Sequence, residues 1–497
     1  MGFQASSSTE PSEVDEVEDQ FLQTPKSSFW AKFSDYGVEM RGAEPVPVEK
    51  RIDTRYVNVF TVFATSLTSL LPIGIGSVTT IGYGLSLRDA ALMIVFLQFL
   101  FTIPAAYIMT IAPRTGMRQM IQSRYCFGKY CNFLTTIIVI LTVGGFGVTG
   151  SINGAQCLAA VRPGTLTVEA AIAVIMVLSM AIGFMGYRVM HFFTRWAWIP
   201  SLLAIVILIG AAGDQLWRQQ VPAETQPAQA YLGMVAFTAG NMVTWGNVAG
   251  DYACYMPPSA PRFRLAAYCL LGLALPFSLL MVFGAAIGGA VFAIPAWEVA
   301  YKAGGIGAVL GEILITRLGN FGRFVLVVLG LSIIATCGRD VYSVSCNLSN
   351  LTAVAPGIRK VPRSILSIIA AAVIIAVAIP ASTSFVSSVT AFLSIIGYYA
   401  GSSVTCFLTE YLYFRKRNPY NFDPKIWNDG RALPTGLSAL AAVLSSWALI
   451  IPSMQSDWYT GPIAQKTGDL GFEFAVVVSL LAYIPIRSLE IKIRGRL

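Results

Sequence analysis

The chain of 497 residues is 55% hydrophobic and only 12% charged, and its mean hydropathy is +0.65. A soluble domain carries about 25% charged residues, so this composition excludes a soluble protein of this size and predicts an integral membrane protein. The net charge of +8 is then expected to mark basic loops at a membrane surface, and nucleic-acid binding is not predicted.

The first 55 residues form a region of different character. They contain "SSSTEPSEVDEVEDQ", and they hold 11 acidic against 6 basic residues. Such a polar, acidic segment is expected to be disordered. Because the first long apolar run starts near Val57, no signal peptide is predicted, and residues 1–55 are expected to form a cytosolic N-terminal tail.

Beyond this tail the chain is a succession of apolar segments. A membrane-spanning helix needs about 20 mostly apolar residues, and twelve segments meet this requirement: Tyr56–Gly82, Asp89–Ile111, Tyr130–Val161, Leu166–Phe184, Phe192–Ala212, Gln229–Tyr255, Leu265–Ile294, Phe321–Leu348, Ile365–Ser382, Ser384–Phe414, Leu433–Pro452 and Phe472–Ile486. The sequence therefore predicts an all-α integral membrane protein with a twelve-helix domain over residues 56–486, or eleven spanning helices if the last segment lies flat. Residues 487–497 are expected to be a short basic tail.

The distribution of basic residues predicts the orientation. With the N-terminal tail inside the cell, the loops and tail on the cytosolic side beyond residue 55 hold 20 Lys and Arg residues, and the outward loops hold 7. Cytosolic loops carry the excess of basic residues in membrane proteins. Both termini are therefore expected to be cytosolic.

The first apolar segment carries the signals of a broken helix. Ser66 is followed by Pro72, Gly74 and Gly76 at membrane depth, and interrupted helices of this kind form the substrate sites of secondary transporters. An ordinary proline kink is the simpler explanation of the same residues.

The sixth segment repeats this character. Its polar and small residues crowd one apolar stretch: Gly240, Asn241, Trp245, Gly246, Asn247, Gly250 and Asp251. Trp245 is suited either to stacking on a flat ring or to packing against lipid or the protein core. Asp251 is either a functional carboxylate within the membrane or the end of the helix. In the third segment, several glycines surround Phe146, and they permit close approach of a ligand or of another helix.

Broken helices five segments apart suggest two five-helix halves in inverted orientation. The eighth segment contains a further anomaly, the adjacent charges Arg339 and Asp340 in "LSIIATCGRDVYSVSCNLSN". They mark either the point where a membrane helix meets water or a functional pair in the protein interior.

Enzymatic chemistry is not predicted. The sequence has no G-x-x-x-x-G-K-[ST] nucleotide motif, its only histidine is His191, and its eight cysteines show no C-x-x-C spacing. No metal site and no cofactor are expected. These features indicate a carrier driven by an ion gradient.

Three stretches resemble the fungal purine–cytosine permeases of the nucleobase–cation symporter family: "PRTGMRQMIQSRYCFGKY", "WGNVAGDYACYMP" and "FLSIIGYYAGSSVTCFLTEYLYFRK". The resemblance implies twelve helices, arranged as a five-plus-five inverted repeat with two additional C-terminal helices, and proton-coupled uptake across the plasma membrane. It also implies a substrate site among segments one, three, six and eight.

The resemblance assigns substrate-site positions in three of these segments. It places the family's substrate-contacting serine on Ser66 and its tryptophan on Trp245, the latter followed by Gly246. In the third segment the aromatic and asparagine positions fall on Phe146 and Gly150, so the ring is retained and an amide is missing.

The eighth segment departs from the family pattern. Members carry an Asn-Asn-x-Pro-Asn run before a tyrosine, and anchoring on Tyr342 puts Arg339 and Asp340 on its last two positions. The amides that would pair with a nucleobase are absent, which puts the substrate in doubt.

The expected function is proton symport of a small, flat nitrogen heterocycle, with cytosine or purines as the family default. Asp340 is the first candidate for proton coupling, followed by Asp251 and Glu410. Arg339 is the expected counter-ion of Asp340 or of an anionic substrate. The alternatives are a carrier for another ring, such as pyridoxine or a vitamin-like compound, and a sensor that no longer transports.

Overall fold

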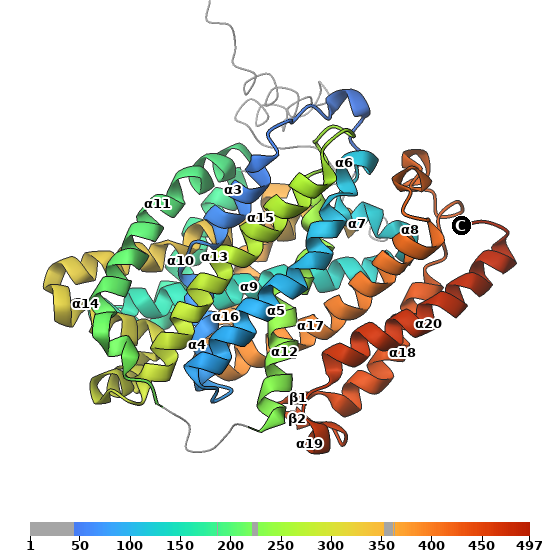
Figure 1. The fold of residues 1–497 in the computed structure, drawn as a ribbon. Helices are drawn as coiled ribbons and strands as arrows, with labels where there is room; N and C mark the ends of the chain where they lie inside the picture. Colours follow the sequence, from blue (N-terminus) through green and yellow to red (C-terminus); the bar gives the residue numbers. More distant parts are fainter. Residues whose placement is uncertain (1–43, 186, 221–226, 352–360, 362) are drawn as a thin grey trace, which may run out of the picture.

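The computed structural model describes residues 44–497 except residues 186, 221–226, 352–360 and 362. The described chain is built almost entirely of helices, which cross one another in a single assembly (Figure 1). The expected disorder of residues 1–43 concerns residues that lie outside the described part of the chain.

The longer helices account for most of the described residues. They are α3 (Val57–Leu67), α4 (Leu70–Ile81), α5 (Leu87–Met109), α9 (Asn132–Ala160), α10 (Val168–Met185), α11 (Tyr187–Ala212), α12 (Ala228–Met242), α13 (Arg262–Val291), α14 (Pro295–Leu331), α15 (Ile333–Asn350), α16 (Arg363–Ala381), α17 (Phe385–Thr409), α18 (Leu437–Ser453) and α20 (Gly471–Arg494).

Short elements connect these helices. They are the helices α6 (Ala112–Thr115), α7 (Gln119–Gln122), α8 (Arg124–Phe127) and α19 (Ala464–Thr467), the 3-10 turns η1 (Val48–Lys50), η2 (Gly213–Trp217), η3 (Val243–Asn247), η4 (Ala249–Tyr252), η7 (Ser382–Ser384), η9 (Pro419–Asn421) and η10 (Pro424–Ile426), the π turn η8 (Glu410–Phe414), and the strands β1 (Gln455–Ser456) and β2 (Tyr459–Thr460). The two strands form an antiparallel hairpin.

Several helices are suited to a membrane. In the described part of the chain, seven stretches are long and apolar enough to cross a bilayer, or eight if α3 and α4 form one bent span. They are Leu87–Thr115, Asn132–Ala160, Trp196–Trp217, Arg262–Val291, Pro295–Leu348, Ile365–Phe414 and Gly471–Arg494. The apolar helices at Val168–Phe184 and Leu437–Ser453 are shorter. The expected all-α membrane protein is therefore observed.

Helices α3 and α4 are separated by a sharp break, and their axes differ by 62°. Pro72 lies in the first turn of α4, and a proline ring clashes with the carbonyl four residues earlier, here that of Thr68. Ser69 accordingly has an extended backbone (φ −148°, ψ 178°). The broken helix predicted from the sequence is thus present.

The segment expected at Phe321–Leu348 is distributed over two helices. Helix α14 changes direction at Gly319, whose φ of 58° is readily adopted only by glycine. The chain then continues past Ser332 into α15, and Arg339 lies in the middle of that helix.

Helices α4 and α13 pack with their backbones in direct contact. A Cβ atom on Gly76 would lie 2.0 Å from the carbonyl oxygen of Met281, and one on Gly284 would lie 2.0 Å from that of Ile73. Small residues allow such close approach between membrane helices. This contact holds the second half of the broken helix against α13.

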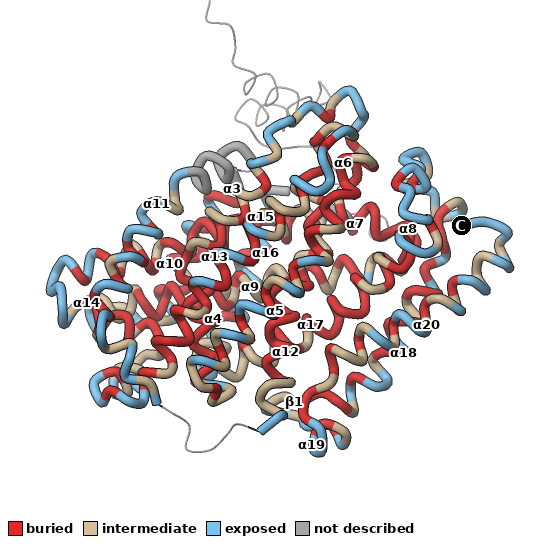
Figure 2. The backbone as a smooth tube through the Cα atoms, viewed as in Figure 1, coloured by how far each residue is buried: buried red, intermediate tan, exposed pale blue. Residues whose placement is uncertain are grey.

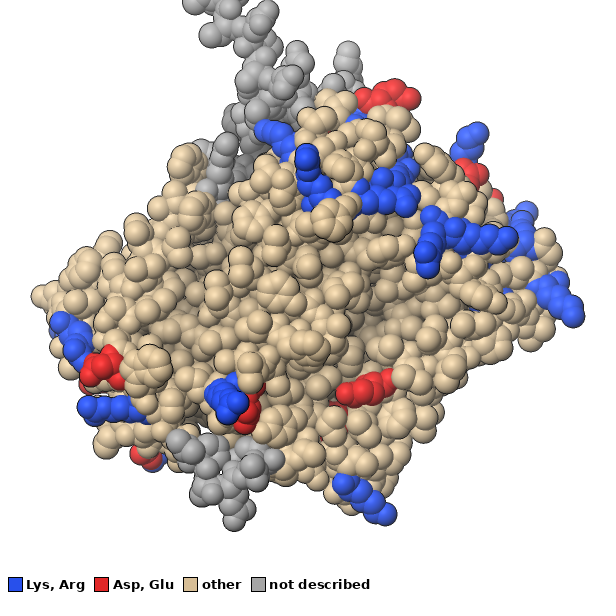
Figure 3. All heavy atoms as spheres, viewed as in Figure 1, with Lys and Arg blue, Asp and Glu red and all other residues tan. Residues whose placement is uncertain are grey.

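Burial and charge follow the expected membrane geometry. Buried residues gather in the middle of the molecule and exposed ones at its outside (Figure 2). Figure 3 shows charged side chains along two opposite edges of this face, with a broad band of uncharged residues between them. An uncharged band is what a hydrocarbon core requires.

Two residues of the segment 44–55, which the sequence assigns to the disordered tail, are buried: Val46 and Arg51. Arg51 is buried, and its guanidinium donates to the carbonyl oxygens of Val46 (2.8 Å), Pro113 (3.1 Å), Arg114 (3.1 Å) and Thr115 (3.1 Å). Carbonyls at the end of a helix lack partners within that helix. Here the guanidinium of Arg51 provides hydrogen bonds to the last three carbonyls of α6. These bonds hold Arg51 against the chain that follows α5.

A buried carboxylate lies in the loop between α19 and α20. Asp469 accepts hydrogen bonds from the hydroxyl of Tyr398 on α17 and from the amide of Gly471 (2.9 Å). Burial raises the pKa of Asp469 to about 6 from its ordinary value of 3.8. The loop carboxylate therefore connects α17 with the start of α20.

We expect the Gly76→Ala substitution to prevent correct assembly, because the added methyl group would collide with the backbone of α13. The yield of monodisperse, fluorescently tagged protein in detergent measures this effect. Gly144→Ala is the matched control, since a Cβ atom there meets nothing within 4 Å. Equal yields for the two variants would contradict the packing described.

We expect Asp469 to make stability depend on pH. Because its folded-state pKa of about 6 lies above the ordinary value of 3.8, the folded protein binds the proton more tightly than the unfolded chain does. Its contribution therefore becomes more favourable as the pH falls from about 6 to about 4. Melting temperatures in detergent should show this trend, and Asp469→Asn should remove it. Asp457 is exposed and lies in the preceding hairpin, so Asp457→Asn is the control. If Asp457→Asn also removed the pH dependence of the melting temperature, the assignment of that dependence to Asp469 would be refuted.

Candidate functional site

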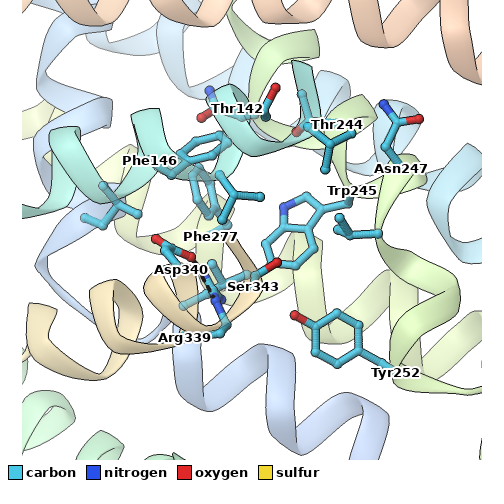
Figure 4. Close-up of a pocket in the computed structure, with 16 residues that line it drawn as sticks. Thr142, Phe146, Thr244, Trp245, Asn247, Tyr252, Phe277, Arg339, Asp340 and Ser343 are labelled. Atoms are coloured by element: carbon cyan, nitrogen blue, oxygen red, sulfur yellow. Dashed lines mark hydrogen bonds and ion pairs between the residues drawn. The ribbon is translucent and has the colours of Figure 1, made fainter. Parts of the chain in front are cut away.

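A cavity lies where the break between α3 and α4 meets the end of α12 (Figure 4). It contains about 640 Å³ of empty space, part of which is open solvent. Its lining residues come from α3, α4, α9, α12, η3, η4, α13 and α15: Leu67, Leu71, Val139, Thr142, Val143, Phe146, Asn241, Thr244, Trp245, Asn247, Val248, Tyr252, Phe277, Arg339, Asp340 and Ser343.

Arg339 and Asp340 form an ion pair on the cavity wall. The guanidinium donates from Nη2 (2.9 Å) and Nε (3.2 Å) to Oδ1 of Asp340. The two residues are only 7% and 2% exposed, and eleven further helical residues follow Arg339 in α15. The pair thus lies inside the protein, and the interpretation of these charges as a helix end is wrong.

Ser66 connects this pair to the broken helix. Its hydroxyl accepts a hydrogen bond of 2.9 Å from Nη1 of Arg339, and its carbonyl oxygen accepts one of 3.0 Å from Thr336. A third bond runs from the amide of Leu70 to the hydroxyl of Ser332 (3.2 Å). The backbone groups that the break releases are thus satisfied by side chains of α15 and of the residue that precedes it.

Trp245 and Phe146 supply aromatic walls. The guanidinium of Arg339 lies over the indole of Trp245, 5.2 Å from its centroid, at a distance typical of a cation–π interaction. Phe146 packs edge-on against Phe392 with centroids 5.6 Å apart. Figure 4 shows the indole on the opposite side of the cavity from Phe146 and Asp340, and aromatic walls favour a flat ring.

Two predicted substrate contacts do not line the cavity. A Cβ atom on Gly150 would lie 3.2 Å from Sγ of Cys337, so α15 fills the space in front of this glycine. Gly246 faces Val404 on α17, where a Cβ atom would approach to 2.8 Å. Both glycines permit close helix packing, and the expectation that they contact substrate has no geometrical support.

Two candidates for proton coupling also lie outside the cavity. Asp251 in η4 accepts a hydrogen bond of 2.7 Å from the amide of Gln119. Glu410 is completely buried and contacts Arg415 (3.0 Å), Arg487 (3.1 Å) and Tyr483 (2.9 Å). These partners give both carboxylates a role in packing.

Several lining residues were not predicted as substrate contacts from the sequence. Asn241 and Asn247 stand in the crowded sixth segment, at spacings of four and two residues from Trp245, and Ser343 lies one turn beyond Arg339. The four-residue helical spacing from Trp245 and from Arg339 is the signal that could have identified Asn241 and Ser343. Phe277 on α13 has no such signal, because it is one apolar residue among many.

The described residues contain no group of three or more His, Cys, Asp or Glu side chains that could hold a metal ion. The cavity offers instead two aromatic walls, one ion pair and a few amides and hydroxyls. Such a site can bind a small flat molecule.

Residues 45–472 match the model of a family described as permease for cytosine/purines, uracil, thiamine, allantoin. The purine-cytosine permease fcyB of Emericella nidulans is 30% identical over 475 residues, which cover 93% of this chain and 91% of the relative. The purine-cytosine permease FCY2 of Saccharomyces cerevisiae is 27% identical over 95% and 90% of the two chains.

A more distant relative is the vitamin B6 transporter TPN1 of Saccharomyces cerevisiae, 23% identical over 83% of this chain and 80% of the relative. Among solved structures, Mhp1, a nucleobase-cation-symport-1 family transporter in a closed conformation with bromovinylhydantoin bound, superimposes with a TM-score of 0.67. The identity is 15%, and the match covers 91% of this chain and 96% of Mhp1. This likeness shows the fold.

The matched family consists of permeases, which move solutes across membranes and are not enzymes. The match extends over most of the chain, and the fold agrees with that of a transporter. The chain is a multi-pass membrane protein that belongs to the permease family for cytosine/purines, uracil, thiamine and allantoin.

Proposed function

We propose that this protein is a secondary active transporter that couples proton entry to the uptake of a small, flat nitrogen heterocycle. The observation that carries the proposal is the cavity at the break between α3 and α4, walled by Trp245 and Phe146 and containing the buried pair Arg339–Asp340. Substrate sites of secondary transporters lie at interrupted helices of this kind. The relatives are described as purine-cytosine permeases, which supports a nucleobase-type ring.

The proposed architecture has twelve spanning helices over residues 56–486, with a five-plus-five inverted repeat and two additional helices, and residues 487–497 as a basic tail. Interrupted helices in the first and sixth positions support the repeat. The excess of basic residues on one side, 20 against 7, supports cytosolic termini. We place the protein in the plasma membrane, where uptake from outside would occur.

Within the site, Ser66, Phe146, Trp245, Arg339 and Asp340 are the proposed substrate contacts. Arg339 is the counter-ion of Asp340 in this scheme, because three of its N–H groups are already engaged by Asp340 and Ser66. Asp340 is also the proposed site of proton coupling, since it is the carboxylate on the cavity wall. Asp251 and Glu410 are weaker candidates, because each is bound to other parts of the protein.

A second candidate substrate is a vitamin-like ring such as pyridoxine. It is favoured by the similarity to a vitamin B6 transporter and by the replacement of the expected amides with Arg339 and Asp340. Both candidates need the same cavity, and they differ in the ring that occupies it.

The proposed function is tested by uptake in yeast that lacks its own nucleobase and pyridoxine permeases. We expect saturable uptake of labelled cytosine, adenine or pyridoxine, faster at acidic than at neutral external pH and abolished by a protonophore. Trp245→Ala should remove most of this uptake, because the stacking wall is lost. Trp217→Ala is the matched control, since Trp217 is 87% exposed. Absence of uptake with protein at the cell surface, or equal uptake at all pH values, would overturn the proposal.

The buried pair predicts a compensating double substitution. Removing one partner of a buried ion pair costs about 3 to 5 kcal/mol, because the other charge is left without its partner. Arg339→Gln and Asp340→Asn should therefore each lower the melting temperature in detergent, and the double variant should recover much of the loss. Additive losses would show that the two charges do not stabilise each other.

A further inference from the structure

The indole of Trp245 is in contact with an aromatic ring from the first half of the broken helix. The ring of Phe63 on α3 lies 5.3 Å from that of Trp245, centroid to centroid, and the two planes meet at 74°. Rings at this separation and angle form a favourable edge-to-face pair. Trp245 therefore has a fixed aromatic neighbour in addition to the guanidinium of Arg339.

Phe63 also contacts a second aromatic residue of the cavity. Its centroid lies 4.9 Å from that of Tyr252, at an angle of 65° between the planes. Trp245 and Tyr252 both line the cavity, whereas Phe63 does not and is only 1% exposed. Phe63 thus packs against two wall residues from outside the cavity.

The local backbone does not hold these two wall residues firmly. Trp245 lies in η3 and Tyr252 in η4, which are short 3-10 turns. The hydrogen bonds of a 3-10 turn have poorer geometry than those of an α-helix. The orientation of both rings therefore depends on contacts with other parts of the protein.

Helix α3 can provide such a contact because it is held on two sides. Ser66 follows Phe63 by three residues, on the same helix face, and accepts the hydrogen bond from Arg339 on α15 (2.9 Å). On α13, a Cβ atom added to Gly272 would lie 3.0 Å from Cα of Phe60 and 3.3 Å from Cβ of Phe63. The backbone that carries Phe63 is thus closely packed against α13.

We infer that Phe63 is a positioning residue, which sets the orientation of Trp245 and its spacing from Tyr252. It acts through Trp245 and does not touch the ligand. The inference rests on the proposed function and adds to it a residue outside the cavity. Helix α3 then supports the indole twice, directly through Phe63 and indirectly through the bond from Ser66 to Arg339.

The first test removes the ring of Phe63 and keeps the site apolar. For Phe63→Leu, we expect the dissociation constants of cytosine, adenine or pyridoxine with the purified protein to rise about fivefold, which is the order of one aromatic pair. The KM for uptake should rise by the same factor, and the maximal rate per protein at the cell surface should be unchanged. Phe63→Met, whose flexible side chain fills a similar space, tests the same loss if the leucine variant is not monodisperse. Unchanged dissociation constants would overturn the inference.

A double-mutant cycle separates positioning from a general effect on packing. In a Trp245→Ala background, Phe63→Leu should change the dissociation constant less than twofold, because the residue that it positions is absent. The same fivefold factor in both backgrounds would show that Phe63 does not act through Trp245.

Phe237→Leu is the matched control. Phe237 is fully buried, does not line the cavity, and packs at 71° against Tyr83 with centroids 5.6 Å apart. This variant loses the same kind of ring contact, and its dissociation constants should equal those of the unmodified protein. Weakening as large as in Phe63→Leu would overturn the inference, because any lost ring contact would then have the same effect.

The failures of the two proposals are distinguishable. If the unmodified protein neither transports nor binds cytosine, adenine or pyridoxine, the proposed function fails and the inference fails with it. If the unmodified protein transports one of these compounds and Phe63→Leu binds it equally well, the inference alone fails.

Discussion

The site depends on how a broken helix satisfies its backbone inside a membrane. Hydrocarbon offers no partner to free N–H and C=O groups, so the break at Thr68 and Ser69 needs partners from elsewhere in the protein. Ser332 and Thr336 form hydrogen bonds to backbone groups beside the break, and Arg339 donates to the hydroxyl of Ser66. Their spacing of four and then three residues places them on one face of the helix. The same face that stabilises the break also carries the ion pair into the cavity.

The ion pair is acceptable at this depth because its charges are matched. An isolated charge within a membrane protein is expensive, whereas Arg339 has Asp340 and Ser66 on its donors and the indole of Trp245 on its face. Charge neutrality and aromatic contact thus reduce the cost of burying the guanidinium. The carboxylate is less completely satisfied, since Oδ2 is open. Of the two side chains, only the carboxylate has a buried polar atom without a hydrogen-bond partner.

The sequence predicts those parts of the site whose residues are unusual within an apolar membrane helix. Pro72 predicts the helix break, and two charged residues in an apolar run indicate the ion pair of Arg339 and Asp340. Trp245 is a large aromatic residue among glycines and amides. The helical class and the membrane location follow from composition alone. These features are readable because each is costly unless the tertiary structure compensates for it.

The remaining features depend on how helices are rotated and where they turn. Gly150 follows Phe146 by four residues and shares its helix face, yet Cys337 occupies the space before it. Arg51 looks like part of a polar tail, and only the folded chain brings the carbonyls after α5 to its guanidinium. The turn at Gly319 likewise appears in the sequence as one glycine among 44. Such contacts join distant segments, and local patterns do not encode them.

The position of the pair has a consequence for any motion of the transporter. Arg339 and Asp340 are neighbours on α15, so their mutual bonds persist if that helix moves as a unit. The bond from Arg339 to Ser66 joins α15 to α3, which lies 273 residues earlier in the chain. Alternating access by relative motion of two halves would break this bond and leave the neutral pair intact. The guanidinium would then have a free donor beside the open oxygen of Asp340, and the hydrogen-bonding pattern offered to a ligand would differ between the two states.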